Sequence, residues 1–286
     1  DKMIIARDRH GLRPLCLGKL DGSYVVVSET CALDLIGAEY IRDIKPGELL
    51  ILDEKGKRSF QINKVNKKHC IFEFVYFSRP DSHIFSTSVD KIRRKLGKTL
   101  ALEKPVAGGD IVISVPDSSN TAAVGFSQRS EARFEIGLIR NHYVGRTFIC
   151  PSQEVRDFSV KLKFNTIKGV LENRRVVIVD DSIVRGTTLK KLVRMIKKAN
   201  PKEIHIRIAS PPVKFPCYYG MDFPSEEELI ANRMELEKIK EHLDVDSLEY
   251  LSVKGLLEST QMDHDNFCTA CFTSEYVEPI KEEESL

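Results

Sequence analysis

The stretch VVIVDDSIVRGTT, residues 176–188, decides the fold. An unbroken run of valine and isoleucine is typical of a strand that is buried on both faces, as in a parallel sheet. Two aspartates follow at once, so Asp180 and Asp181 are expected where that strand ends. Adjacent carboxylates at such a place are unfavourable unless something positive meets them. The stretch therefore predicts a ligand site at the carboxyl end of a parallel strand.

The residues after the aspartates favour a phosphate ligand. Ser182, Gly186, Thr187 and Thr188 supply hydroxyl groups and an unhindered backbone at the predicted start of a helix. The first N–H groups of a helix have no partners within it and carry partial positive charge, which suits a phosphate monoester. The Walker pattern G-x-x-x-x-G-K-[ST] is absent from the sequence. The alternative interpretation is that Asp181 and Ser182 only cap the helix.

Strands and helices alternate around this stretch. The pattern predicts strands at 110–116, 133–140 and 203–210 and helices at 88–103, 119–130 and beyond 188, the last with apolar spacing at Leu189, Leu192, Val193 and Ile196. Such alternation predicts an α/β fold in which helices cover a parallel sheet. The polar segment 140–166 is long enough for a functional or disordered loop. The last 75 residues are expected to be acidic and mainly helical.

Residues 2–68 have a different pattern. Short apolar runs are separated by glycine-containing turns, which predicts a β-rich segment with one helix at about 30–37. The chain begins with Asp1 rather than Met, and we expect it to be a piece of something longer.

Composition excludes several classes of protein. The 44 basic and 42 acidic residues leave a formal net charge of +2, which gives no strong field toward nucleic acid or an anionic membrane. No apolar run approaches the roughly 20 residues that cross a bilayer. We expect a soluble, cytoplasmic protein. Seven cysteines without a secretory signal favour metal or redox chemistry over a disulfide framework.

The whole string 176–188 resembles the phosphoribosylpyrophosphate signature of type I phosphoribosyltransferases. In that family the acidic pair binds the ribose hydroxyls and helps to hold Mg²⁺, and the following loop binds the 5′-phosphate. The resemblance therefore implies a substrate-binding set of Asp180, Asp181, Ser182, Ile183, Val184, Arg185, Gly186, Thr187 and Thr188.

Further strings narrow the resemblance. They are GLRPL (11–15), SETCALD (28–34), YFSRPDS (76–82), VPDSSN (115–120) and NHYVGRTFI (141–149). All are similar to segments of the glutamine phosphoribosylpyrophosphate amidotransferases, which begin purine synthesis. This resemblance implies a Mg²⁺-dependent attack of ammonia, released from glutamine, on phosphoribosylpyrophosphate. It also implies a homotetramer and feedback inhibition by purine nucleotides.

The same resemblance assigns roles on two loops. Asp117 and Ser118 would lie near the pyrophosphate, and Ser118 with Asp180 and Asp181 would form the protein side of the Mg²⁺ site. For Ser118 the alternative is a helix cap.

The segment containing Tyr143, Arg146 and Lys163 resembles the family's mobile loop, which closes over the substrate. For Arg146 and Lys163 the alternative is a solvated surface charge. The sequence departs from the family at His142, where an arginine is expected, and at Arg140, where a lysine is expected.

Four cysteines are candidate metal ligands. Cys268 and Cys271 form C-x-x-C, which alone fits zinc, an iron–sulfur cluster or a redox pair. Cys70 and Cys217 lie in strings similar to cluster-bearing amidotransferases, so the resemblance implies a [4Fe-4S] cluster on these four thiolates. Zinc and inert buried thiols are the alternatives. The resemblance gives no role to Cys16, Cys31 or Cys150.

The resemblance also predicts the domain organisation. Residues 1–68 would be the C-terminal remnant of a class II glutamine amidotransferase domain, and residues 69–286 a phosphoribosyltransferase domain with a cysteine-bearing tail. The glutaminase nucleophile is not among these residues, so we expect at most ammonia-dependent activity. The alternatives are a nucleobase-salvage phosphoribosyltransferase, a non-catalytic regulator that binds phosphoribosylpyrophosphate, and an inactive gene product.

Overall fold

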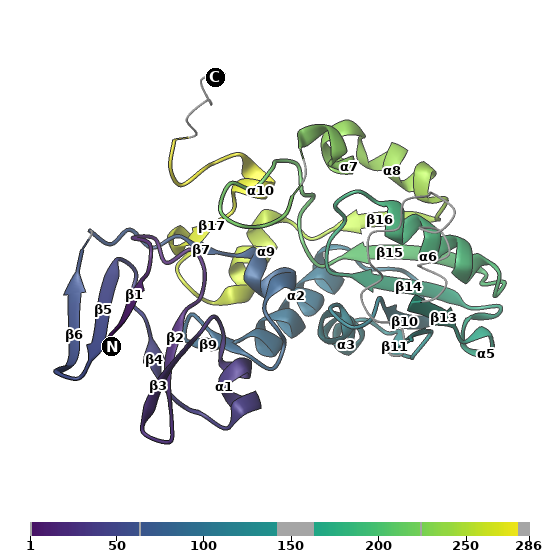
Figure 1. Ribbon diagram of the computed structural model, residues 1–286. Helices are drawn as coiled ribbons and strands as arrows, with labels where there is room; N and C mark the ends of the chain where they lie inside the picture. Colours follow the sequence, from purple (N-terminus) through teal and green to yellow (C-terminus); the bar gives the residue numbers. More distant parts are fainter. Residues whose placement is uncertain (1, 63, 142–162, 224, 280–286) are drawn as a thin grey trace, which may run out of the picture. The chain divides into compact units, whose positions relative to one another are not determined.

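The computed structural model describes residues 2–62, 64–141, 163–223 and 225–279 (Figure 1). The chain forms two compact units, one of residues 1–91 and 261–286 and the other of residues 92–260. The predicted boundary between residues 68 and 69 remains a prediction, because it separates segments by the protein family that each resembles, whereas these units are defined by how compactly the chain is folded. Among the described helices, none is long and apolar enough to cross a membrane.

A five-stranded sheet forms the centre of the second unit. The strands are β10 (Ile111–Ser114), β11 (Arg133–Phe134), β14 (Arg175–Asp180), β15 (Glu203–Ile208) and β16 (Ser247–Tyr250). Their order is β11-β10-β14-β15-β16, and every neighbouring pair is parallel. Val176 to Val179 have no exposed surface because β14 is the central strand. The predicted parallel sheet is confirmed.

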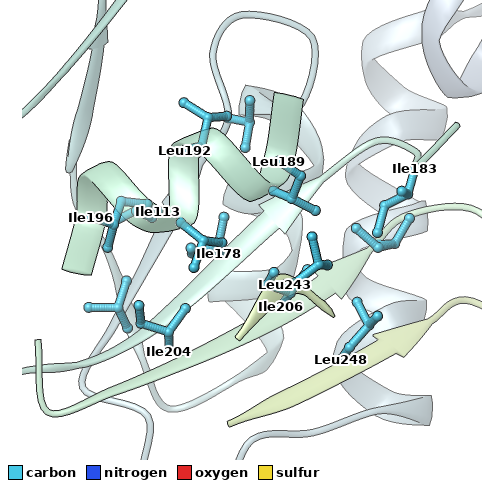
Figure 2. Close-up of a cluster of buried hydrophobic side chains, with 14 of the residues drawn as sticks. Ile113, Ile178, Ile183, Leu189, Leu192, Ile196, Ile204, Ile206, Leu243 and Leu248 are labelled. Atoms are coloured by element: carbon cyan, nitrogen blue, oxygen red, sulfur yellow. The ribbon is translucent and has the colours of Figure 1, made fainter. Parts of the chain in front are cut away.

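Two helices cover one face of this sheet. Leu189, Leu192 and Ile196 of α6 (Thr187–Lys197) pack with Ile239 and Leu243 of α8 (Leu236–Leu243) in one hydrophobic cluster (Figure 2). The sheet contributes alternate residues to the cluster, among them Ile113, Ile178, Ile204, Ile206 and Leu248. The i, i+3, i+4, i+7 spacing read in the sequence thus faces the core.

The other helices in the described part of this unit are α2 (Val89–Glu103, of which residues from 92 belong here), α3 (Asn120–Arg129), α5 (Lys168–Leu171), α7 (Ile230–Arg233), α9 (Val253–Thr260) and the 3₁₀ turn η2 (Glu226–Glu228). Of these, α3 contacts both β10 and β14. It follows β10 directly, so its first residues lie beside the carboxyl end of β14.

One prediction about this unit is wrong. The expected strand 133–140 is split into β11 and β12 (Leu138–Arg140), and β12 pairs antiparallel with β13 (Phe164–Thr166) outside the main sheet. The chain leaves the sheet edge at Gly137, where an added Cβ would lie 2.7 Å from Ile113 Cγ2. The last 75 residues contain helices, as predicted, but they also contain the strand β16, which was not predicted.

The first unit is mainly antiparallel. One sheet has the order β1-β5-β6 and another β3-β2-β4. Their strands are β1 (Lys2–Ala6), β2 (Cys16–Leu20), β3 (Ser23–Val27), β4 (Glu39–Asp43), β5 (Glu48–Asp53) and β6 (Gly56–Gln61). The helix predicted at 30–37 is α1 (Thr30–Ile36), which ends at Gly37 with φ 71°. The β-rich prediction for this segment is confirmed.

The other elements in the described part of the first unit are short. They are β7 (His69–Cys70), the π-helix η1 (Glu73–Phe77), the hairpin β8 (His83–Ile84) and β9 (Thr87–Ser88), the 3₁₀ turn η3 (His264–Asn266), β17 (Phe267–Cys268) and α10 (Ala270–Thr273). The strands β7 and β17 pair in parallel although about 200 residues of chain separate them. Ile5, Leu17, Ile44, Leu50 and Leu52 form the core of the antiparallel part.

Candidate functional site

The acidic pair lies at the carboxyl end of β14, as predicted. Asp180 is the last residue of the strand and is partly buried, whereas Asp181 is only 6% exposed. The backbone N–H of Asp181 donates a hydrogen bond to Oδ1 of Asp180 at 2.9 Å. The two carboxylates therefore occupy one partly closed site at the end of the central strand.

A serine that the sequence analysis did not select lies against both aspartates. Oγ of Ser119 is 2.8 Å from Asp180 Oδ1 and 3.3 Å from Asp181 Oδ2, and Ser119 has no exposed surface. It is brought there because β10, which precedes it, pairs in parallel with β14. The string VPDSSN indicated a serine at this place, but it contains two adjacent serines, and the sequence does not show which of them faces the aspartates.

Two further hydroxyl groups hold Asp181. Oγ of Ser182 donates to Asp181 Oδ1 at 2.7 Å, and the side chain of Ser118 also hydrogen-bonds Asp181. The helix-cap alternative for Ser118 is wrong, because the N-cap residue of α3 is Ser119. The cap alternative for Asp181 and Ser182 is also wrong, because α6 has Gly186 as its N-cap residue.

The electrostatics of the pair favour a bound cation. Burial, followed by the charge of Asp181, raises the pKa of Asp180. Burial also raises the pKa of Asp181, although hydrogen bonds from Ser118 and Ser182 and the positive charge of the buried Arg93 oppose the shift. Carboxylate and hydroxyl oxygens suit Mg²⁺, which takes few protein ligands and keeps water or phosphate oxygens as the others. The donor set thus fits Mg²⁺.

The loop between β14 and α6 is shaped by Gly186. Its φ of 74° is a left-handed conformation, and an added Cβ would lie 2.7 Å from Ile230 Cδ1. No side chain caps α6, and its first turn has no acidic residue. Backbone N–H groups at the start of α6 are therefore suited to an anion such as a phosphate.

The other loop residues have distinct contacts. Ile183 is buried in the hydrophobic cluster, and the carbonyl oxygen of Val184 accepts a hydrogen bond from the N–H of Ile230 at 2.9 Å. Arg185 pairs with Glu228, with 2.6 Å between Nε and Oε2. Thr187 and Thr188 begin α6, and both are exposed. The contacts of Ile183, Val184 and Arg185 anchor the loop to the rest of the unit, and the exposed Thr187 and Thr188 remain accessible to a ligand.

The remaining predicted residues are only partly described. Asp117 forms an ion pair with Arg140, with 2.7 Å between Oδ2 and Nη1, and both side chains are about half exposed. The carbonyl oxygen of Lys163 accepts a hydrogen bond from the N–H of Asn141 at 2.8 Å. The other residues predicted on this segment lie outside the described residues, namely His142, Tyr143, Arg146 and Cys150.

Three of the four candidate cluster ligands belong to the first unit. Cys70 and Cys268 are direct partners in the parallel ladder of β7 and β17, and the nearby α10 contains the buried Cys271. Burial raises the pKa of Cys70 to about 12. Thiol groups are the donors that iron–sulfur clusters and zinc require, so the chemistry of these residues fits either group.

Cys217 lies in the second unit, where its Sγ accepts a hydrogen bond from the N–H of Tyr219 at 3.3 Å. Nowhere in the described ranges do three or more His, Cys, Asp or Glu side chains converge as they would around a metal ion. Cys16 and Cys31 are buried core thiols.

Comparison with known proteins agrees with this architecture. The family model of the phosphoribosyl transferase domain matches residues 99–210, which include β10, β14 and the acidic pair. The fold is also similar to that of the glutamine phosphoribosylpyrophosphate amidotransferase of B. subtilis complexed with ADP and GMP. That likeness has a TM-score of 0.90 at 45% identity and covers 99% of this chain and 63% of that one. The predicted α/β phosphoribosyltransferase fold is confirmed.

Curated relatives extend the similarity over nearly the whole chain. Amidophosphoribosyltransferase 1, chloroplastic, of Arabidopsis thaliana is 52% identical over 283 residues, which are 98% of this chain and 50% of the relative. Amidophosphoribosyltransferase of Bacillus subtilis is 46% identical over 291 residues, covering 100% of this chain and 61% of the relative. The chain thus spans roughly half to three fifths of the length of these relatives.

Proposed function

Because the chain is a homologue of amidophosphoribosyltransferases, we propose that it transfers the phosphoribosyl group of phosphoribosylpyrophosphate to ammonia. The products would be 5-phosphoribosylamine and pyrophosphate, the first step of purine synthesis. The observation that carries this proposal is the acidic pair Asp180 and Asp181 at the end of β14, next to the uncapped start of α6. Carboxylates for a ribose and N–H groups for its phosphate lie only a few residues apart.

The residues of the site would bind and orient the substrate rather than act as strong acids or bases. Asp180 and Asp181 would receive the ribose hydroxyls, and the loop 182–188 would receive the 5′-phosphate. Asp117 and Ser118 would lie toward the pyrophosphate, with Ser118, Asp180 and Asp181 holding Mg²⁺. When bound, Mg²⁺ neutralises the charge of the pyrophosphate and so assists its departure.

The segment with Tyr143, Arg146 and Lys163 would close over the bound substrate. Basic groups that arrive on closure would stabilise the departing pyrophosphate and exclude water. This assignment rests on the resemblance of the NHYVGRTFI string, residues 141–149, to the mobile loop of the family.

A nucleobase-salvage phosphoribosyltransferase would share the acidic pair and the phosphate loop. The similarity to amidophosphoribosyltransferases, however, also extends over residues before 99 and after 210, outside the match to the phosphoribosyl transferase domain. We therefore favour the amidotransferase reaction over salvage or a purely regulatory role.

Pyrophosphate release tests the proposal. The chain with phosphoribosylpyrophosphate and Mg²⁺ should release pyrophosphate when ammonium is added. For these 286 residues on their own we propose ammonia as the nucleophile, and turnover with glutamine in its place would contradict that choice. Asp181→Ala should abolish turnover. If a free purine base, and not ammonium, supported release, the salvage alternative would be correct.

We also propose a [4Fe-4S] cluster on Cys70, Cys217, Cys268 and Cys271. Support comes from the C-x-x-C spacing, the pairing of Cys70 with Cys268, and the family resemblance of the strings that hold Cys70 and Cys217. Protein purified without oxygen should show a broad absorbance band at roughly 400 nm, typical of clusters bound by cysteine thiolates. Stoichiometric zinc without this band would favour the zinc alternative.

Three broader properties are proposed, the first from a relative and the other two from the family resemblance of the sequence. The B. subtilis homologue is described as complexed with ADP and GMP, so we propose purine nucleotides as feedback inhibitors. A homotetramer and a cytoplasmic location complete the proposal. The names of the plant relatives place those proteins in the chloroplast.

A further inference from the structure

We infer that Ser119 is a positioning residue for the acidic pair, because its buried hydroxyl holds Asp180 with one carboxylate oxygen left available to a ligand. This inference rests on the proposed function, since the ligand would be phosphoribosylpyrophosphate with Mg²⁺. It concerns a residue that touches the binding carboxylates and not the substrate.

The first observation is that Ser119 does not act as a helix cap. It occupies the N-cap position of α3, where a serine oxygen normally accepts a hydrogen bond from a backbone N–H two or three residues later. Its side chain makes no such bond. The hydroxyl is directed instead to Asp180, 61 residues away in the sequence.

The second observation is how the oxygens of Asp180 are used. A serine hydroxyl has one proton, and the shorter of its two contacts is the 2.8 Å distance to Asp180 Oδ1. The N–H of Asp181 donates to the same oxygen at 2.9 Å. Oδ1 is therefore held by two donors, whereas Oδ2 of Asp180 has no hydrogen bond to any residue that the structure describes.

The two aspartates are consequently not equivalent. Asp181 is 6% exposed, with Oδ1 held by Ser182 at 2.7 Å and Oδ2 facing Ser119 at 3.3 Å. Asp180 is more exposed, and its Oδ2 has no hydrogen-bond partner among the described residues. The geometry points to Oδ2 of Asp180 as the oxygen that the pair presents outward, and to Ser119 as the group that fixes this orientation.

Removing the hydroxyl group of Ser119 should therefore weaken ligand binding and not only lower the stability of the fold. Without it, Asp180 keeps a single donor on Oδ1 and its carboxylate can rotate. No hydroxyl then bridges the two carboxylates. Hydrogen bonds to charged groups are among the stronger ones in proteins, so a loss of affinity of roughly tenfold is expected.

The test compares three variants by calorimetry with phosphoribosylpyrophosphate at a series of Mg²⁺ concentrations. Ser119→Ala removes the hydroxyl, and Ser119→Cys replaces it with a weaker donor of similar size. Ser127→Ala is the matched control on the same helix, because Oγ of Ser127 donates to the carbonyl oxygen of Ala132, at 2.9 Å, and makes no hydrogen bond to the acidic pair in the described part of the chain. Thermal unfolding without ligand is measured for each variant.

We expect affinity to fall in the order wild type, Ser119→Cys, Ser119→Ala, with roughly a tenfold loss in the last. The Mg²⁺ concentration that gives half-maximal binding should rise in the same order. Ser127→Ala should bind like the wild type. A loss of folding alone would lower the fraction of binding-competent protein and leave the affinity and the Mg²⁺ requirement of the folded fraction unchanged.

Wild-type affinity in Ser119→Ala, together with lost binding in Asp181→Ala, would overturn this inference and leave the proposed function standing. No Mg²⁺-dependent binding by the folded wild type would instead remove the proposed function. If Ser119→Ala does not fold, Ser119→Cys decides, because unchanged affinity in that variant also contradicts a positioning role.

Discussion

A Cβ atom added to Gly97 would lie 1.8 Å from the carbonyl oxygen of Ala122. The helices α2 and α3 therefore touch backbone to backbone. A second contact of the same kind occurs at Gly125, where an added Cβ would lie 2.1 Å from the carbonyl oxygen of Arg94. Because α3 begins beside the acidic pair, this packing also sets the direction of Ser119.

Gly97→Ala should destabilise the second unit. The methyl group must displace backbone atoms of α3, so a loss of about 2–3 kcal/mol is expected in denaturant unfolding. Gly169→Ala is the control, because nothing lies within 4 Å of a Cβ at that helical position. That substitution should be neutral or stabilising by up to about 1 kcal/mol. Equal unfolding curves for the two variants would show that α2 and α3 do not pack this closely.

Gly186→Ala should weaken phosphate binding by the loop 182–188 and lower the stability of the fold. The substitution destabilises the fold in two separable ways. Alanine is strained at the left-handed φ of 74°, and its Cβ would lie 2.7 Å from Ile230 Cδ1. Together these should lower the free energy of unfolding by roughly 2 kcal/mol and weaken phosphoribosylpyrophosphate binding.

Adding Ile230→Val removes Cδ1 and should restore part of this loss, which a double-mutant cycle measures. Strict additivity of the two substitutions would mean that the backbone conformation alone explains the effect of Gly186→Ala.

The first unit should lose stability in acid through Glu48. Burial by itself raises the pKa of this carboxyl, but hydrogen bonds from Arg42, Ser59 and the N–H of Lys45 outweigh burial and lower the pKa to about 2. The carboxylate is 2% exposed. A lowered pKa stabilises the fold at pH values above the ordinary pKa of the unfolded chain, and this stability disappears as the pH falls toward about 2.

Glu48→Gln should therefore destabilise the protein by about 2 kcal/mol at pH 7 and reduce the dependence of stability on pH in the acid range. Unfolding by urea between pH 2 and pH 7 checks this; the ordinary carboxyl range of about pH 4 should mark the upper end of the transition. A variant with the wild-type slope would show that Glu48 is not the responsible group.

Asp180 should have the opposite effect on stability. Burial and the charge of Asp181 raise the pKa of Asp180. At pH values between the pKa of the unfolded chain and this raised pKa, the carboxyl group is protonated in the folded protein but ionised in the unfolded chain. The stability of the ligand-free protein should accordingly fall as the pH rises above about 4. In Asp180→Asn, the stability of the ligand-free protein should fall less as the pH rises, and the variant should be more stable than the wild type at pH 8. The variant should also lose Mg²⁺-dependent substrate binding.

Mg²⁺ with phosphoribosylpyrophosphate should raise the unfolding temperature of the wild type and not that of Asp180→Asn. Asp222→Asn is a control at an exposed carboxylate in the same unit and should behave like the wild type. If Asp180→Asn destabilised the ligand-free protein at pH 8, the acidic pair would be a structural element and not a site kept for a cation.

The cysteines give a further prediction. Cys268→Ser should remove the visible absorbance of protein prepared without oxygen, because Cys268 is the ladder partner of Cys70 and a proposed ligand. Cys16→Ser changes another buried thiol of the same unit, one with no proposed ligand role, and should keep the absorbance. Equal spectra for both variants would contradict the proposed ligand set.

The sequence was sufficient where local pattern and burial determine structure. The run 176–179 predicts a doubly buried strand, and the same run places Asp180 and Asp181 at its carboxyl end. The spacing of Leu189 and its apolar successors gives the orientation of α6 correctly. These features depend on residues close together in the chain, so a linear pattern contains them.

Tertiary structure decided which side chains meet. Sequence reasoning chose Ser118, although it is Ser119 whose hydroxyl bridges the aspartates. Neighbouring residues of equal chemistry differ only in direction, and that direction follows from how α3 packs on α2 at Gly97 and on the sheet. The opposition of Cys70 to Cys268 likewise depends on the register of β7 and β17. Contacts between distant segments are fixed by packing over many residues, and no short stretch of sequence contains that information.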